Sequence, residues 1–133
     1  MPKLLITGSR DWTEYGVILE AIRNSGCTIV IRGNARGADT LGKTAALALR
    51  YEHRAYPAKW DVHGKAAGPI RNQEMLDKEH THDHPIELCL AFPLAQSRGT
   101  YDMMRRAHKA GIQVIVYRVG GTFDTWSPTR GTE

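Results

Sequence analysis

The chain has 133 residues and a formal net charge of +4, and 41% of its residues are hydrophobic and 24% charged. These values lie close to the averages of globular domains, so they exclude a largely disordered chain and suit a single domain. Because no apolar run is long enough to cross a bilayer and the N-terminus lacks a signal-peptide pattern, we expect a cytoplasmic protein without a membrane partner.

Strand-like and helix-like segments alternate along the chain. Short apolar runs, several of them rich in β-branched residues, predict five strands, at residues 3–7, 27–32, 53–57, 86–92 and 113–119. Apolar residues at helical spacing, helix-favouring composition or an initial proline predict four helices, at residues 15–24, at 40–51, from Pro69 onward and at 101–110. This alternation is typical of a three-layer α/β domain with helices on both faces of a parallel sheet. We assign residues 1–119 to that domain and residues 120–133 to a polar C-terminal tail.

Ligands of parallel α/β sheets bind outside the carboxyl ends of the strands, where the strand order reverses. With a strand order of 3-2-1-4-5, three loops meet there, namely residues 8–12 (GSRDW), 33–39 (GNARGAD) and 93–100 (PLAQSRGT). Each loop carries glycine, an arginine and a hydroxyl or carboxylate group. A loop that only reverses the chain direction needs glycine but no arginine. Three arginines at one end of the sheet therefore predict an anion-binding crevice.

Residues 37–44 (GADTLGKT) have the spacing of the phosphate loop of nucleoside triphosphatases. If Asp39 is the N-cap of the second helix, Lys43 and Thr44 lie inside that helix, and Lys43 is an ordinary surface lysine. A magnesium-binding aspartate at the end of a second strand is also missing. We therefore favour a backbone phosphate nest over residues 33–39 and keep the P-loop NTPase as the weaker alternative.

Arg71 falls in the first turn of a helix that starts at Pro69, where the helix dipole disfavours a cation by about 0.3–1 kcal/mol. A bound anion would remove that cost, and Lys65 and His63 add positive charge nearby. The structural alternative for Arg71 is a salt bridge. Trp60 offers a flat face on which a base could stack, and core packing explains it equally well.

Several ordered motifs together resemble the YspA-type branch of the SLOG superfamily, over residues 4 to about 117. They are Gly8-Ser9-Arg10, Gly33 with Arg36-Gly37-Ala38-Asp39, Trp60, residues 64–72 (GKAAGPIRN) with Met75, and Ala91-Phe92-Pro93 followed by Arg98-Gly99-Thr100 and Met103. The resemblance implies a Rossmann-like fold similar to that of the Lonely Guy phosphoribohydrolases. It also implies a nucleotide-derived ligand, and some members of the superfamily act in conflicts between bacteria and phages.

The chain departs from the hydrolase pattern P-G-G-x-G-T-x-x-E at one position. Met103 stands where that pattern has its glutamate, and a thioether cannot stabilise an oxocarbenium ion or activate water. Asp102 is one residue away and would point about 100° around the helix. The other candidate catalytic carboxylates are Asp11 and Asp39, and Asp39 also suits a role as helix cap or ribose acceptor.

The sequence therefore predicts a sensor or sequestering protein for a phosphate-containing nucleotide derivative, with no required cofactor. Four arginines favour a diphosphate such as an ADP-ribose or NAD-derived compound over a nucleoside monophosphate. The alternatives are an N-glycosidase of the phosphoribohydrolase type and, more weakly, single-stranded nucleic-acid binding. Relatives that resemble the hydrolases often pair, so a homodimer is expected. The predicted ligand-binding residues are Gly8, Ser9, Arg10, Gly33, Arg36, Gly37, Asp39, Trp60, Gly68, Arg71, Asn72, Arg98, Gly99 and Thr100.

Two further groups of residues receive no functional role. His80, His82 and His84 alternate, so an extended segment would turn all three toward one metal, but the segment lies at the end of the sheet away from the crevice. We interpret it as a solvated loop. Cys27 and Cys89 lie in apolar runs, where lone cysteines usually act as buried hydrophobic residues.

Overall fold

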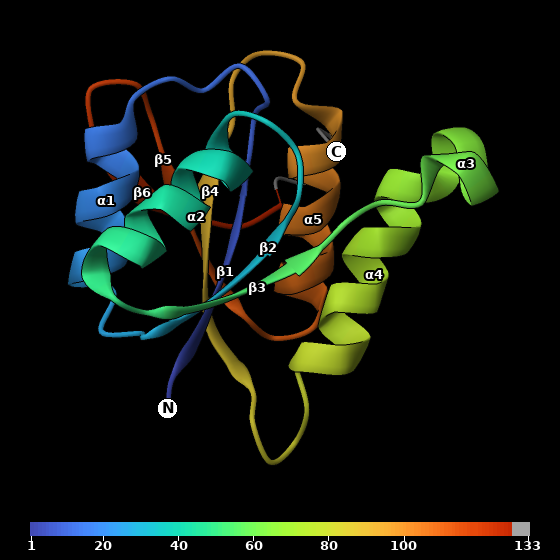
Figure 1. Ribbon diagram of the computed structural model, residues 1–133, viewed down its shortest axis with the longest axis horizontal. Helices are drawn as coiled ribbons and strands as arrows, with labels where there is room; N and C mark the ends of the chain where they lie inside the picture. The colour runs from blue at the N-terminus through green and yellow to red at the C-terminus, as the bar shows by residue number, and fades with distance from the viewer. Residues whose placement is uncertain (129–133) are drawn as a thin grey trace.

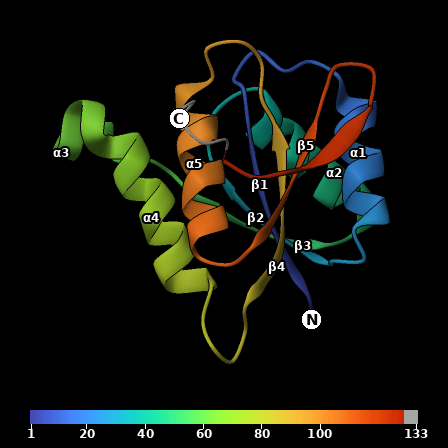
Figure 2. The same cartoon turned by 180° about the vertical axis from the view of Figure 1, so that it is seen from behind.

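The structure is a computed structural model and describes residues 1–128. One sheet lies between two layers of helices, with α1 and α2 on one face and α4 and α5 on the other (Figures 1 and 2). The strands are β1 Lys3–Gly8, β2 Ile29–Gly33, β3 Glu52–Tyr56, β4 Ile86–Phe92, β5 Gln113–Tyr117 and β6 Phe123–Trp126. The helices are α1 Tyr15–Asn24, α2 Ala38–Leu49, α3 Trp60–His63, the 3-10 helix η1 Gly64–Ala66, α4 Ala67–Glu79 and α5 Arg98–Lys109.

The sheet has the order β3-β2-β1-β4-β5-β6, and its first five strands are parallel. Leu5 of β1 lies opposite Ile31 of β2 on one side and Cys89 of β4 on the other. The strand order therefore reverses at β1, as predicted. The α/β class, the three layers and the order of the five parallel strands are confirmed.

The prediction of five strands is wrong, because β6 adds a sixth strand that pairs antiparallel with β5. Gly120 and Gly121 both have positive φ, which lets the chain reverse within a few residues. Phe123 then stacks on Tyr117, with ring centroids 5.1 Å apart. β6 lies within the segment predicted as a polar tail, and the last part of that segment, residues 129–133, lies outside the described residues.

Both faces of β1, β2 and most of β4 are buried, which explains their apolar runs, whereas the edge strand β3 (EHRAY) is polar and partly exposed. Leu4 and Ile6 face α1 and α2, whereas Leu5 faces α4 and α5. Cys27 and Cys89 are free and buried, as predicted, and burial raises the pKa of the Cys89 thiol to about 12. Among the described helices, none has the length and apolar character needed to cross a membrane.

The sequence also failed to indicate two local features. Residues 60–63 form the short helix α3, which projects from the body of the molecule, and α4 begins at Ala67 rather than at Pro69 (Figure 1). Arg71 is consequently in the second turn of α4. Since the helix dipole acts mainly within the first turn, the electrostatic argument for an anion at Arg71 is weakened.

A buried charge cluster joins β1, β3 and the end of α4. Glu79 accepts hydrogen bonds from Tyr56 Oη at 2.6 Å and Arg54 Nη1 at 2.8 Å, and Lys3 Nζ lies 3.4 Å from its carboxylate. Burial alone would raise the pKa of Glu79, but the hydrogen bond from Tyr56 and the contacts with Arg54 and Lys3 outweigh it and lower that pKa. These contacts tie the three elements together, and nothing in the sequence spacing predicted them.

Candidate functional site

The loops after β1 and β2 pack directly against each other. A side chain at Gly8 would collide with Ala38, and one at Gly37, whose φ is +77°, would collide with the backbone of Arg10. The Ser9 carbonyl accepts a hydrogen bond from the Ala38 N–H at 3.1 Å, and the Ser9 hydroxyl accepts one from the Asp11 N–H at 3.0 Å. These predicted ligand-binding residues therefore have a structural function in the contact between the two loops.

Asp39 is buried in the same region, with 6% of its surface exposed. Gly37 is the N-cap of α2, so the prediction that Asp39 caps this helix is wrong. The Asp39 carboxylate instead accepts a hydrogen bond from the Ala35 N–H at 3.2 Å and holds the loop closed. Burial raises the pKa of Asp39 to about 6, although this hydrogen bond and the positive charges of Arg71 and Arg32 act against the rise.

The segment that matches a phosphate loop does not have the geometry of one. Lys43 and Thr44 lie in the second turn of α2, away from its N-terminus, and Lys43 is exposed. Thr44 Oγ1 donates a hydrogen bond to the Thr40 carbonyl at 3.2 Å. Neither residue is positioned to bind a phosphate at the start of a helix, which agrees with the sequence interpretation.

Arg71 contacts the carboxyl ends of β2 and β3. Its guanidinium lies against Gly33, and its Nη1 donates a hydrogen bond to the Tyr56 carbonyl at 3.0 Å. Burial lowers the pKa of Arg71, and the charge of Asp39 acts in the opposite direction. Its Nε donates to Asn72 Oδ1 at 3.1 Å.

Arg10 and Arg36, the two arginines predicted on the β1 and β2 loops, are exposed, and Arg36 forms a surface ion pair with Asp11 at 3.4 Å.

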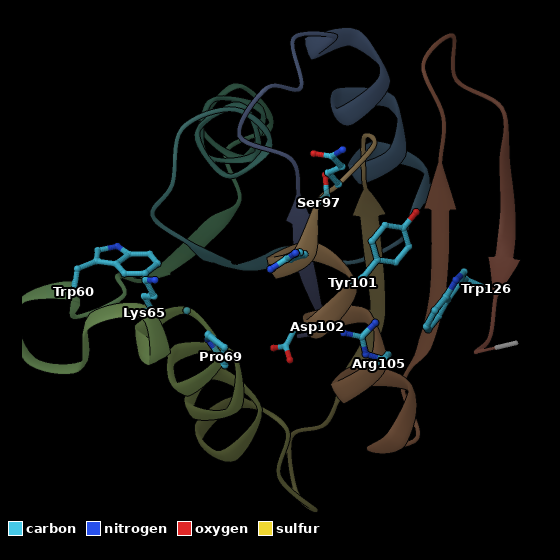
Figure 3. Close-up of a pocket in the computed structure, with 12 residues that line it drawn as sticks. Trp60, Lys65, Pro69, Ser97, Tyr101, Asp102, Arg105 and Trp126 are labelled. Atoms are coloured by element: carbon cyan, nitrogen blue, oxygen red, sulfur yellow. The ribbon is translucent and has the colours of Figure 1, made fainter. Parts of the chain in front are cut away.

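A groove of about 730 Å³ lies beside the predicted crevice, across α5. Its volume is in the range that holds small ligands. We call it the α5 groove; it is lined by Trp60, Lys65, Gly68, Pro69, Gln96, Ser97, Arg98, Gly99, Tyr101, Asp102, Arg105 and Trp126 (Figure 3). It unites the predicted residues Trp60, Gly68, Arg98, Gly99 and Asp102. The predicted residues of the β1 and β2 loops do not line it.

One face of α5 forms the floor of this groove. Arg98, Tyr101, Asp102 and Arg105 follow the spacing i, i+3, i+4, i+7, which places their side chains on the same side of the helix. Figure 3 shows Trp60 of α3 and Trp126 of β6 on opposite sides of α5. Trp60 is 59% exposed, so most of its surface is free to meet a ligand. Sequence reasoning missed Tyr101, Arg105 and Trp126.

The amino end of α5 contributes Arg98 and Gly99 to the lining of the groove. The Ser97 hydroxyl accepts a hydrogen bond from the Leu94 N–H at 3.0 Å and does not cap α5, and the first turn contains no acidic residue. Within residues 1–128, the N–H groups of Gly99 and Thr100 have no hydrogen-bond acceptor. Free N–H groups at a helix N-terminus attract anions, and Arg98 adds a full positive charge there.

Asn72 lies beneath the groove and is buried. Its Nδ2 donates to the Gly99 carbonyl at 3.3 Å and to Asp102 Oδ2 at 3.0 Å. Arg106 Nε donates to the same Asp102 oxygen at 2.8 Å. The structure thus gives Asn72, which was predicted to contact ligand, the function of joining α4 to the floor of the groove.

Met103, which stands at the position of the hydrolase glutamate, points into the protein interior. Met103 is fully buried in the core beneath α5, together with Met104. A glutamate in place of Met103 would therefore enter the core if α5 kept its present orientation. Of the three candidate carboxylates, Asp102 lines the groove, Asp11 is exposed on the β1 loop, and Asp39 is buried.

His80, the first residue of the histidine segment, has a structural function. His80 Nδ1 accepts a hydrogen bond from the Ile86 N–H at 2.9 Å, and its Nε2 lies 3.1 Å from the Ala110 carbonyl. Both ring nitrogens are therefore engaged, while His82 and His84 are exposed. In residues 1–128, no three His, Cys, Asp or Glu side chains form a group that could hold a metal ion.

No established protein-family profile matches the chain. The chain is 39% identical, over 125 residues, to the Gene 61 protein of Mycobacterium phage D29, and the match covers 86% of this chain and 95% of that protein. The chain belongs to the Gene 61 protein family. A relative encoded by a phage agrees with the phage setting that the superfamily resemblance implies.

The fold of this Gene 61 family member is also found in DNA processing protein A (DprA) from Streptococcus pneumoniae. The two structures superpose with a TM-score of 0.63 at 20% sequence identity, over 88% of this chain and 50% of DprA. The chain thus spans half the length of DprA, and the likeness shows a shared Rossmann-like fold. That fold is the one expected of the SLOG superfamily, and membership of the superfamily and of its YspA-type branch stays a prediction.

Proposed function

We propose that the protein binds a phosphate-containing nucleotide derivative in the α5 groove, with a phosphate at the amino end of α5. The observation that carries this proposal is that the N–H groups of Gly99 and Thr100 have no acceptor among residues 1–128, and that Gly99 lines the groove together with Arg98 and Lys65. Two N–H donors and two cations match the charge and the acceptor oxygens of a phosphate group.

The aromatic side chains at the two sides of the groove favour a nucleotide over a free phosphate ion. Trp60 and Trp126 both line the groove, and each presents an indole ring against which a base can pack. Arg105 lies two turns along α5 from Arg98, a distance of about 10 Å. This spacing supports a ligand with a second negatively charged group, such as a diphosphate of the ADP-ribose or NAD-derived type.

Binding without turnover is the function that these residues support best. Met103 supplies no carboxylate, and the protein would then act as a sensor or would sequester its ligand. An N-glycosidase remains the alternative, since Asp102 is a carboxylate within the groove. Product formation from AMP or NAD that disappears in Asp102→Ala, while ligand binding persists, would favour the enzyme.

Nucleic acid is a third occupant to be tested, because the structural neighbour is named a DNA processing protein. A strand would interact through several phosphates, so its affinity should increase with strand length and fall steeply with salt. A nucleotide bound at a single site should show a weaker salt dependence. Titrations at two salt concentrations with AMP and with oligothymidylates of increasing length distinguish these two ligand classes.

The decisive test is substitution of Gly99. A side chain at this position would meet no atom within 4 Å, so the substitution leaves the fold unstrained. Gly99→Asp places a carboxylate where we expect the phosphate, although an acidic residue in the first helical turn favours folding. We expect Gly99→Asp to abolish nucleotide binding and to keep or raise thermal stability, and Gly99→Asn to retain most of the binding.

The first measurement is mass spectrometry of small molecules released from the purified protein, followed by calorimetric titration with AMP, ADP and ADP-ribose. A released intact nucleotide supports a sensor, and a released free base or ribose phosphate supports an enzyme. If Gly99→Asp binds the nucleotide as tightly as the unmodified protein does, the phosphate is not at the amino end of α5 and the proposal fails.

A further inference from the structure

The floor of the α5 groove contains one carboxylate, and its two oxygens have different surroundings. Asp102 Oδ2 accepts hydrogen bonds from Asn72 Nδ2 at 3.0 Å and from Arg106 Nε at 2.8 Å. Oδ1 accepts no hydrogen bond from residues 1–128, and it is not buried. Figure 3 shows the Asp102 side chain between α5 and the start of α4, on the Pro69 side of the groove.

The two donors hold this carboxylate in one orientation. Asn72 is buried, and Arg106 is itself held by a hydrogen bond of 2.9 Å from its Nη1 to Gln73 Oε1. A group that is oriented before the ligand arrives loses little conformational entropy on binding. The ion pair with Arg106 explains the orientation of Oδ2, and it leaves Oδ1 available to accept a hydrogen bond from a ligand in the groove that Asp102 lines.

The chemistry around Asp102 restricts what Oδ1 can meet. A phosphate is repelled by a carboxylate, whereas a hydroxyl group can donate a hydrogen bond to it. Asp102 follows Gly99 by three residues, about 4.5 Å along the helix axis. This is comparable with the span of one sugar ring, so a phosphate at Gly99 brings the attached sugar close to Asp102.

We propose that Asp102 Oδ1 accepts a hydrogen bond from a ribose hydroxyl of the ligand, so that the α5 groove binds a ribonucleotide more tightly than the analogue that lacks that hydroxyl. This inference rests on the proposed function and adds the class of sugar to it. A hydrogen bond to a charged group contributes enough for about a tenfold difference in affinity. The loss of that hydroxyl would leave Oδ1 without a donor from the ligand.

The test compares AMP with 2′-deoxy-AMP and 3′-deoxy-AMP by calorimetric titration. The unmodified protein should bind AMP about tenfold more tightly than at least one of the two deoxy analogues. Asp102→Asn changes the polarity of the free position, because its amide oxygen must face the donors Asn72 and Arg106 and its NH₂ group must then face the groove. The sugar hydroxyl can accept a hydrogen bond from this NH₂ group, but a hydrogen bond without a charged partner is weaker, so the variant should prefer AMP over that analogue by no more than about threefold.

Asp83→Asn is the matched control, since Asp83 is exposed on the loop before β4 and does not line the groove. It should keep the tenfold preference. The comparison of AMP with its analogues on the unmodified protein needs no variant, so the inference stays testable even if Asp102→Asn fails to fold. An equal loss of affinity for all three nucleotides in a folded Asp102→Asn would mean a structural function and would overturn the inference.

The outcomes also separate this inference from the proposed function. Equal affinity of the unmodified protein for AMP and both analogues, with all binding lost in Gly99→Asp, overturns the ribose selection and leaves the phosphate site intact. If none of the three nucleotides binds at millimolar concentration, and ADP and ADP-ribose do not bind either, both proposals fail.

Discussion

The guanidinium of Arg71 lies against the α-carbon of Gly33, in the space that the side chain of any other residue would occupy. Through its hydrogen bond to the Tyr56 carbonyl, Arg71 also holds the end of β3. One side chain from α4 therefore fixes the carboxyl ends of two neighbouring strands. This contact gives Arg71 a structural function that the sequence did not indicate, and it makes Gly33 sensitive to substitution.

We expect Gly33→Ala to destabilise the fold by about 1–3 kcal/mol, because the new methyl group must displace Arg71 or Asp39. The free energy of unfolding in urea measures this. Gly16→Ala is the control, since a side chain at this position in the first turn of α1 meets no atom within 4 Å and alanine favours helix over glycine. If the contact with Arg71 is responsible, Gly33→Ala should be less harmful in an Arg71→Ala background than in the unmodified chain.

Asp39 should make stability depend on pH. Its pKa is about 6 in the folded protein and close to the ordinary 3.8 when unfolded, so protonation favours folding. Its stabilising contribution is complete below about pH 4 and is lost as pH rises through 6. The unmodified protein should therefore gain up to about 3 kcal/mol relative to Asp39→Asn when pH falls from 7 to 4. A stability difference that stays constant over this range would contradict the prediction.

Tyr56 should contribute to stability through Glu79. Its hydroxyl donates a 2.6 Å hydrogen bond to the buried Glu79 carboxylate, and burial together with this contact raises the pKa of Tyr56 to about 12. Tyr56→Phe removes that donor and should cost about 1.5–3 kcal/mol. Because the pKa of Glu79 is lowered in the folded state, the loss should be present at pH 7 and should shrink as pH falls below 4.5. Urea denaturation at pH 7 and pH 3 tests both statements.

Substitutions of Arg98 and Lys43 distinguish a phosphate site in the α5 groove from one in the phosphate-loop segment. Arg98 lines the groove, so Arg98→Ala should weaken nucleotide binding by about tenfold. Lys43 lies inside α2 and away from the groove, so Lys43→Ala should leave binding unchanged. Calorimetric titration with ADP measures both effects. The opposite pattern would restore the phosphate-loop interpretation.

The central parallel strands were predictable because strands buried on both faces are mainly apolar, as in residues 88–92 (LCLAF). β6 was not predictable, since it has only four residues, most of them exposed, and it pairs with β5 only after the turn at Gly120 and Gly121. The helix α3 has four residues, too few to give a periodic pattern.

The position of the site was only partly predictable. The sequence located the glycine and arginine loops at one end of the sheet, but it could not indicate that Gly8 and Gly37 bring two of these loops into contact. Asp39 has the residue type of an N-cap, yet the Ser9 carbonyl reaches the first N–H of α2 and Asp39 turns inward. Contacts between segments that are distant in the sequence determine the packing of the two loops and the orientation of Asp39. The pattern of neighbouring residues in the sequence does not indicate such contacts.

The groove draws its two tryptophans from segments 66 residues apart, Trp60 in α3 and Trp126 in β6. A ligand in contact with both would act as a non-covalent cross-link between an arm that projects from the body and the outermost strand of the sheet. Such peripheral segments open more readily than the core. Ligand binding should therefore protect β6 and α3 from proteolysis and slow their amide hydrogen exchange more than it does in the parallel strands.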